Sequence, residues 1–479
     1  MPRPESRTSH RARSGLTVLL ELGLLVTGLS LSAARVAHAD RRLSIADALA
    51  LALGNNTELR LEEEKLREAE ARRKGTRGLY GPKLLSEGNL LVWDSAARFN
   101  LDIDPTTVAA KVPADQMSTL VKYSDLLALF PYIIDMGNVR EQVTAQLSVT
   151  LAQPLTPLLQ IHKGYQATAA LSASQALERD AKRQDIVFRV KDGYLRLAQV
   201  QRMAEVAKTG VDQVSEHLKR ARQFLTAGLI GKQDVLKAEL QLARARERYI
   251  KATYGMSLAS SALAMLLGIS LDETIVPTEQ VTDPPPPFTA AMQSLIRRAD
   301  ELRPELKAME RKQRAADADR GRARYDLLPQ ISAVANYQYT HGQGTFMPAN
   351  TFFVGGVMKW EIWDWGGKLY TIQQAASRAA QAELGKRLLR DGVALQTKKA
   401  YLDLKQSEEA LQVARTAIEE AEENYRIEQR RFAVNANTST DVLDAQLALT
   451  RTKLSYTSAL YGYYMARAAL EHAVGAERL

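Results

Sequence analysis

The two halves of this 479-residue chain carry related segments in the same order, and this duplication constrains the fold more than any other feature. The segment TELR at 57–60 resembles PELK at 304–307, an offset of 247 positions (304 − 57), and the same offset places Pro82 on Pro329. A sequence that repeats itself in this way indicates one structural unit used twice. We therefore predict two structural repeats, residues 40–283 and 284–479.

A second offset locates an insertion. YLRL at 194–197 resembles YLDL at 401–404, an offset of 207 positions (401 − 194), and DVL recurs at 234–236 and 441–443 with the same offset. The first copy therefore holds 40 more residues than the second (247 − 207). We place this insertion at about 96–138, where the sequence pattern is irregular.

Each copy is predicted to contain a helix, a pair of strands, a very long helix and a further helix. In the long helices, apolar residues recur at spacings of three, four or seven, which is the seam of a coiled coil. A helix from Tyr370 to Phe432 would be ~95 Å long at about 1.5 Å per residue. The seam positions match pairwise at the offset of 207: Leu197, Ala204, Ala207, Val211, Val214, Leu218 and Leu225, then Leu404, Leu411, Ala414, Ile418, Ala421, Tyr425 and Phe432.

The predicted strands, within about 82–155 and 329–365, contain all the tryptophans. These are Trp93, Trp360, Trp363 and Trp365, and Tyr337 and Tyr339 share one face of the predicted strand 331–340. Aromatic residues at the ends of ten-residue strands suit the interface girdles of a membrane barrel. A soluble sheet whose aromatic residues pack against helices is the alternative. Four strands cannot close a barrel, so a membrane location requires strands from further copies of the chain.

The first 39 residues are predicted to be a signal peptide. Four arginines precede a mostly apolar stretch at 16–31, and Ala37-His38-Ala39 fits a cleavage site of small residues before Asp40. Beyond this segment we expect no membrane-spanning helix, since no later apolar run approaches about 18 residues. The chain has no cysteine, which excludes disulfides, thiolate metal sites and cysteine-linked lipids.

The charge does not indicate nucleic-acid binding. Removing residues 1–39 takes away five Arg and two Glu, so the net charge falls from +9 to +6. The charges are spread along the predicted helices instead of clustering, as expected for a solvated surface. His162, His217, His341 and His472 share no metal-ligand spacing, and no combination of catalytic groups is apparent. We therefore assign no metal, no cofactor and no enzymatic activity.

Several segments resemble those of the TolC-family outer membrane factors, also called outer membrane efflux proteins. LSIADALALAL at 43–53 resembles the family's N-terminal helix, LLPQIS at 327–332 its entry into a strand, and WDWGG at 363–367 its strand-to-helix junction. AGLI at 227–230 and DVLDA at 441–445 resemble its two periplasmic helix turns. The resemblance covers nearly all of the predicted mature chain, with the segments in the family's order.

The resemblance implies a mainly α-helical protein with a membrane β-barrel portion. Three chains would form a 12-stranded barrel on a 12-helix periplasmic tunnel, embedded in outer membrane lipid and extending far into the periplasm. The implied function is a passive exit duct of a tripartite efflux or type I secretion system. Its periplasmic helix tips would open when a periplasmic adaptor and an inner-membrane pump, of RND or ABC type, engage it. A soluble periplasmic adaptor or structural coiled-coil hairpin protein is the alternative, which leaves the aromatic strand pairs unexplained.

Two aspartates at the start of the last helix are candidate gate residues. Thr438-Ser439-Thr440-Asp441 resembles a capping box, in which Asp441 would stabilise the helix start without any gating role. Capping does not explain Asp444, because its counterpart in the first copy is Lys237. In the family, the matching aspartates line the periplasmic entrance. Three-fold symmetry would arrange them in two carboxylate rings that bind cations.

The residues around the two helix turns complete the predicted site. In the family, a Tyr and an Arg hold the closed entrance, but the corresponding residues are Phe432 and Asn437, which cannot form the same polar links. Asp234 corresponds to the family's partner aspartate. Gly228 and Asn435 occupy equivalent turn positions, and both residue types accept a left-handed conformation, so we predict that they end their helices.

Overall fold

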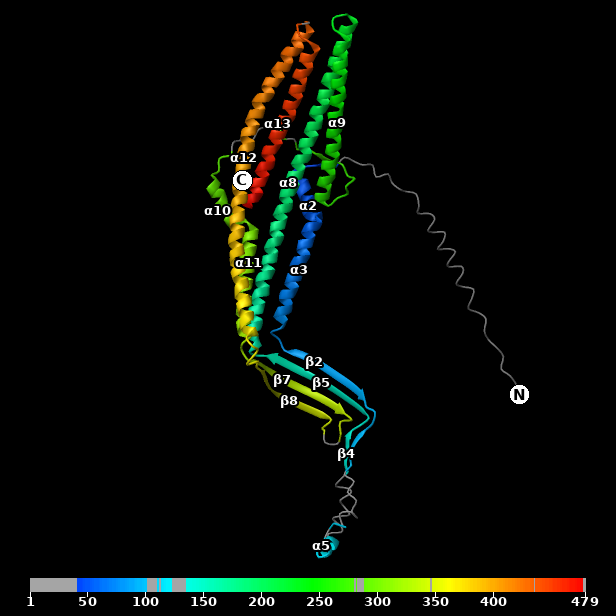
Figure 1. Cartoon of the computed structure of the whole chain (residues 1–479), viewed down its shortest axis with the longest axis vertical. Coiled ribbons are helices and arrows are strands. Elements are labelled where there is room, and N and C mark those ends of the chain that lie inside the picture. Colours follow the sequence, from blue (N-terminus) through cyan, green and yellow to red (C-terminus); the bar gives the residue numbers. More distant parts are fainter. Residues whose placement is uncertain are drawn as a thin grey trace, which may run out of the picture. The chain divides into compact units, whose positions relative to one another are not determined.

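A computed structural model describes residues 41–100, 110–111, 113–122, 135–279, 281, 288–344, 347–434 and 436–476 (Figure 1). The predicted signal peptide and much of the predicted insertion lie outside these residues. In chain order the elements are β1 (Arg41–Leu43), α2 (Ile45–Asn55), α3 (Thr57–Gly78), β2 (Lys83–Val92), β3 (Ala97–Asn100), α5 (Met117–Lys122), β4 (Asp135–Arg140), β5 (Val143–Pro154), α8 (Pro157–Thr226), α9 (Lys232–Leu267), β6 (Ile275–Pro277), α10 (Met292–Leu302), α11 (Pro304–Tyr325), β7 (Gln330–His341), β8 (Asn350–Lys359), α12 (Gly367–Ala433) and α13 (Ser439–Val474).

The helices occur in pairs of similar length. Helices α2 and α10 have 11 residues each, α3 and α11 have 22, and α9 and α13 have 36. The very long helices predicted from the seam are α8, with 70 residues, and α12, with 67. Of the 14 predicted seam positions, ten are buried and the other four are partly buried, so the heptad pattern identified the packed face correctly.

The chain forms two compact units, each of which takes segments from both sequence copies. Unit 1 comprises the segments up to Asn55, Arg189–Pro284 and Leu411–Gly462, and unit 2 comprises Asn56–Phe188, Pro285–Ala410 and the segment from Tyr463. Unit 1 contains the α8–α9 and α12–α13 turns, and unit 2 contains β2, β5, β7 and β8. The compact units therefore do not follow the sequence copies.

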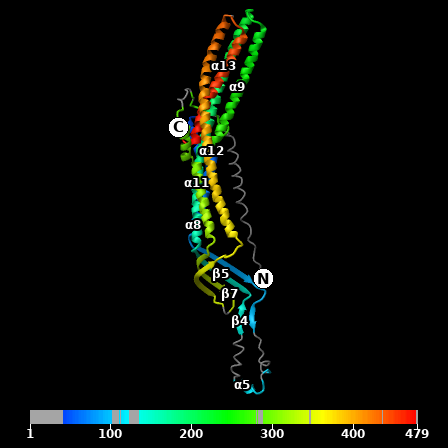
Figure 2. The same cartoon turned by 60° about the vertical axis from the view of Figure 1, so that its left-hand side comes forward.

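The four strands of unit 2 form one antiparallel sheet in the order β2-β5-β7-β8 (Figure 1), and Figure 2 shows the two central strands, β5 and β7, from another side. Successive side chains of a strand point to opposite faces, so the register defines what each face carries. One face carries mostly apolar residues: Leu84, Leu90, Val92, Val143, Leu147, Val149, Leu151, Ala335, Tyr337, Tyr339, Phe352, Val354 and Met358. The other face is largely polar, with Gln146, Ser148, Thr150, Asn336, Gln338, Thr340 and Thr351, interrupted by Leu85, Leu91, Phe353 and Val357.

Helices do not cover the apolar face of this sheet among the described residues. Every residue of the edge strands β2 and β8 is exposed, including Leu84 at 70%, Phe352 at 68% and Val354 at 70%. This exposure contradicts the alternative of a soluble sheet whose aromatic residues pack against helices. Predicted strand boundaries were accurate except at the end of the second pair, because β8 ends at Lys359 and not near Trp365. The described part of the insertion contains β3 paired with β4, and α5.

In unit 1, the helices lie side by side and the two turns lie at the same end of the bundle (Figure 1). Val235, Ala238 and Leu242 of α9 pack with Val214 and Leu218 of α8. One helix in the described part of the chain, α9, is long and apolar enough to cross a membrane by length and composition alone, contrary to our expectation. Packing on α8 covers only part of its apolar surface, because several large apolar side chains of α9 are exposed: Leu236, Leu240, Ile250, Tyr254, Leu258 and Met265.

Candidate functional site

Helix α13 begins with a complete capping box. The Asp441 carboxylate accepts hydrogen bonds from the Thr438 amide (2.8 Å) and hydroxyl (2.7 Å), and the Thr438 hydroxyl accepts one from the Asp441 amide (3.3 Å). These bonds, chiefly that from the Thr438 hydroxyl, hold the pKa of Asp441 below its ordinary value. Asp441 is therefore a negatively charged, exposed residue whose position the helix start itself explains.

Asp444 is one turn further along α13 and also exposed. Its carboxylate accepts no hydrogen bond and forms no ion pair with the residues that the structure describes. Lys237, its counterpart in the first copy, instead donates a hydrogen bond to the Thr440 hydroxyl at 3.2 Å. Local structure thus gives no reason for a carboxylate at position 444, and both aspartates are free to face solvent on the same side of the helix.

The other turn has the predicted glycine geometry. Gly228 has a φ of +74°, and the Leu229 amide donates to the Phe224 carbonyl at 2.9 Å, which closes the end of α8. Asn435, its counterpart, lies outside the described residues, but Ala436 makes the equivalent bond to the Arg431 carbonyl at 2.8 Å. Asp234 lies in the first turn of α9 and is partly exposed.

Phe432 packs inside the helix bundle. It is 3% exposed and belongs to a cluster with Tyr425, Val442, Ala445 and Leu449. Its ring lies 5.1 Å from the His217 ring and 5.2 Å from the Phe224 ring, measured between centroids. Where the family has a polar side chain, this chain therefore has an apolar contact between α12 and α8.

Asn437 bonds within its own hairpin. Its amide nitrogen donates to the Glu428 carbonyl oxygen at 3.0 Å and also to the Glu428 carboxylate. Glu428 lies near the end of α12, and Asn437 lies in the turn that follows it. Asn437 therefore fixes the α12–α13 turn, and it does not join this turn to the α8–α9 turn.

A buried bond between the two hairpins is formed by His217 of α8, which we did not identify from the sequence as functional. Its Nε2 is hydrogen-bonded to the Ser439 hydroxyl at 2.8 Å, and both residues are buried. Burial, and secondarily the charge of Arg220, lowers the pKa of His217 to about 4. Its spacing was an available signal, because His217 interrupts the small and apolar stripe Gly210, Val214, Ala221 and Phe224.

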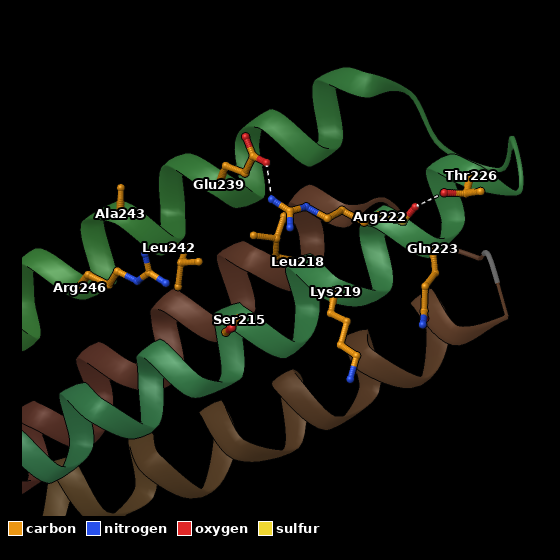
Figure 3. A pocket seen from close by; sticks show the side chains of 10 residues that line it. All are labelled: Ser215, Leu218, Lys219, Arg222, Gln223, Thr226, Glu239, Leu242, Ala243 and Arg246. Carbon is orange, nitrogen blue, oxygen red and sulfur yellow. Dashed lines mark hydrogen bonds and ion pairs between the residues drawn. The ribbon is translucent and has the colours of Figure 1, made fainter.

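A groove of about 650 Å³ lies between α8 and α9 next to their turn (Figure 3). Lys219, Arg222 and Arg246 line it, with Glu239 as its one acidic residue among the lining side chains. Arg222 crosses from α8 to α9 and pairs with Glu239 at 2.8 Å. Lys219 and Arg246 form no ion pair with the described residues, so the groove presents positive charge.

The predicted interface aromatics lie at opposite ends of the sheet. Trp93 directly follows β2 and donates from its indole to the Thr144 hydroxyl at 3.0 Å, while the Arg140 guanidinium lies 3.8 Å from its ring centre. Tyr337 and Tyr339 lie toward this end, on the apolar face with Leu147 and Val149.

Trp360, Trp363 and Trp365 follow β8 at the other end and are 52%, 73% and 87% exposed. Trp365 has a φ of +55°, an uncommon conformation for a residue other than glycine, and Gly366 follows with a φ of +87°. The Asp364 carboxylate accepts from the amides of Gly366 (3.1 Å) and Lys368 (2.6 Å), which forms the start of α12. The strand itself ends earlier, at Lys359, which pairs with Gln330, the first residue of β7.

The histidines have separate environments. His162 is bonded to the Tyr80 hydroxyl at 3.0 Å, His341 lies 3.8 Å from Glu141, and His472 stacks on Phe188 at 4.8 Å. In the described ranges of the chain, no group of three or more His, Asp or Glu side chains is arranged to hold a metal ion.

A sheet with one apolar face and one largely polar face, in one chain with long paired helices, defines the chain as a membrane channel of the helical-tunnel and barrel type. Residues 135–269 and 295–476 match the family model for outer membrane efflux proteins. The chain belongs to this family, and it is an outer membrane efflux channel. The family is one of channels and not of enzymes. This membership, together with the exposed sheet, excludes the alternative of a soluble adaptor.

Individual relatives agree with this assignment. The chain is 25% identical over 370 residues to the antibiotic efflux pump outer membrane protein ArpC of Pseudomonas putida, covering 70% of this chain and 72% of ArpC. The solved structure of CusC has a TM-score of 0.73 at 16% identity, covering 90% of this chain and 92% of CusC. The Campylobacter jejuni CmeC outer membrane channel has a TM-score of 0.71 at 15% identity, covering 90% and 85%. These structural similarities concern the fold.

Proposed function

We propose that three copies of this chain close their four-stranded sheets into one 12-stranded barrel on a 12-helix periplasmic tunnel. The observation that carries this proposal is the exposed, two-faced sheet with the open edge strands β2 and β8. Unpaired backbone groups cannot remain in hydrocarbon, and each edge strand would pair with the opposite edge of the next copy. The residues 40–283 and 284–479 would then act as two repeats, so that each copy contributes four helical segments to the tunnel.

The size of the sheet fits a bilayer. Strands β2 and β8 have 10 residues each, which is about 33 Å at roughly 3.3 Å per residue. A tilt of about 40° reduces this length to a height of about 25 Å, the height of the apolar band of outer membrane barrels. Trp93 with Tyr337 and Tyr339 would form the girdle at one interface, and Trp360, Trp363 and Trp365 the girdle at the other.

At the helix tips, Asp441 and Asp444 would form the cation-binding rings of the entrance. Asp441 is already bonded to Thr438, so its position is fixed, whereas Asp444 has its carboxylate available. Three like charges close to one axis favour bound cations over an empty ring. Asp444 is the better gate candidate, because helix capping supplies no other role for it.

The tips would also receive the periplasmic adaptor, which links the duct to an inner-membrane pump of RND or ABC type. Lys219, Arg222 and Arg246 make the groove between α8 and α9 suitable for an acidic segment of that adaptor (Figure 3). The relative ArpC is described as part of an antibiotic efflux pump, which supports a drug-type cargo for this duct.

The test is to extract the protein from outer membranes with detergent, measure its mass by light scattering, and record currents in planar bilayers. We expect a trimer that forms a cation-selective conductance. A monomer, or a trimer that conducts no ions, would overturn the proposal.

A further inference from the structure

We infer that a hydrogen bond between His217 and Ser439 is the latch that holds the two helix hairpins together while the tips are closed. This inference rests on the proposed duct and supplies the element that Phe432 and Asn437 cannot provide. Phe432 has no polar group, and the Asn437 amide donates within its own hairpin. The two hairpins must therefore be held together at the tips by other side chains.

The bond connects α8 to the first residue of α13. Nε2 of His217 lies 2.8 Å from the Ser439 hydroxyl, across 222 positions of sequence. Ser439 adjoins the capping box and lies two positions before Asp441, so a displacement of Ser439 would move the start of α13 and its aspartates together. The latch thus acts on the same helix end that carries the proposed gate.

Burial makes this bond costly to break. His217 is 6% exposed and Ser439 is 2% exposed, and the ring of Phe432 lies against the imidazole. Loss of one partner would leave a buried polar group without its bond. Movement of the hairpins apart would separate these partners and admit water between them.

A second contact lies beside the latch and nearer to solvent. Lys237 of α9 donates to the Thr440 hydroxyl at 3.2 Å, one residue after Ser439. Since this pair is exposed, water competes for it and its contribution is smaller. The first hairpin therefore contacts the start of α13 through a buried bond from α8 and an exposed bond from α9.

The experiment compares Ser439→Ala, His217→Phe and the double variant with a matched control, Thr457→Ala. Thr457 is as well buried, at 4% exposed, but its hydroxyl donates to the Lys453 carbonyl within α13 and crosses to no other helix. Elution as a trimer establishes that each variant has folded. Hydrogen–deuterium exchange of residues 439–445 and the open probability in planar bilayers are then measured at pH 7.5.

Each single latch variant should raise both the exchange rate and the open probability about 2- to 10-fold, the effect of one buried hydrogen bond. The exchange rate and the open probability of the double variant should be close to those of each single variant, because both substitutions remove the same bond. The latch would be overturned if the exchange rates and open probabilities of the latch variants were no higher than those of Thr457→Ala. Additive effects in the double variant would also overturn it. Absence of current even in the wild type would overturn the duct, while the exchange rates would still decide whether this bond holds the tips together.

Discussion

Acidification should open the tips through His217. In the closed arrangement its pKa is about 4, against an ordinary value of 6.5, because burial disfavours the charged imidazole. In the open arrangement we expect a solvated His217 with an ordinary pKa. The closed state is therefore fully stabilised above pH 6.5, loses stability as the pH falls from there, and has lost all of this contribution below pH 4. Between pH 7 and pH 5 the loss is roughly 2 kcal/mol, a factor of about 30 in the closed-to-open ratio.

The groups around His217 do not reverse this direction. Arg220, on the same helix, also disfavours a second positive charge. The packed face of α12 contributes the Phe432 ring, α13 contributes the neutral Ser439, and Lys237 reaches Thr440 from α9. Asp441 has a lowered pKa and stays ionised throughout the range from pH 7 to pH 5.

The assay is the open probability of single channels as a function of pH, for the wild type and His217→Phe. In the wild type, we expect the open probability to rise steeply below pH 6.5. In His217→Phe, we expect it to be higher than in the wild type above pH 6.5 and to change little as the pH falls. The pKa of His472 is also lowered by burial, so only the difference between the two proteins isolates His217. Parallel pH profiles for wild type and variant would refute the reasoning.

Three further predictions concern the gate and the sheet. Asp441→Ala combined with Asp444→Ala should weaken block by multivalent cations from the periplasmic side, and unchanged block in single-channel recordings would contradict the gate assignment. On β5, Leu147→Arg should cost about 2–4 kcal/mol of membrane stability at the lipid face. Ser148→Arg, on the polar face, should alter conductance but leave the yield of trimer in outer membranes unchanged. Equal losses of yield in the two variants would contradict the assigned faces. Trp365→Gly should relieve the positive φ but lower the yield of membrane-inserted trimer through loss of an interface aromatic, and an unchanged yield would contradict the girdle.

Periodicity predicted the fold well because burial follows it directly. The seam from Leu404 to Phe432 indicated a continuous helix, and α12 covers all of it. The alternation at 331–340 likewise identified the apolar face of β7. The end of β8 was predicted wrongly because the alternation of Trp363 and Trp365 continues past the strand, whereas the ladder with β7 ends at the pair of Gln330 and Lys359.

The candidate site was only partly predictable, since it depends on contacts between distant residues. The capping box at Thr438 and Asp441 is local and could be read from four consecutive residues. Predicting the pairing of His217 with Ser439 requires knowing which faces of α8 and α13 meet. The residues of the two helices do not reveal this on their own. Phe432 has no polar group, and its packing on His217 emerged only from the structure.

The two sequence copies differ at every position of the proposed latch and of the contact beside it. His217 corresponds to Asn424, Ser439 to Lys232, Thr440 to Gln233 and Lys237 to Asp444 at the offset of 207. Exchanging the roles of the two hairpins would therefore pair Asn424 with Lys232, a combination that cannot reproduce a buried imidazole–hydroxyl bond. In a ring of alternating hairpins, one kind of interface between neighbouring hairpins would contain the His217–Ser439 bond. The other kind of interface would lack it. The matched helix lengths fit the proposed repeats, and divergence at these four positions would give the proposed latch to only one kind of interface between hairpins.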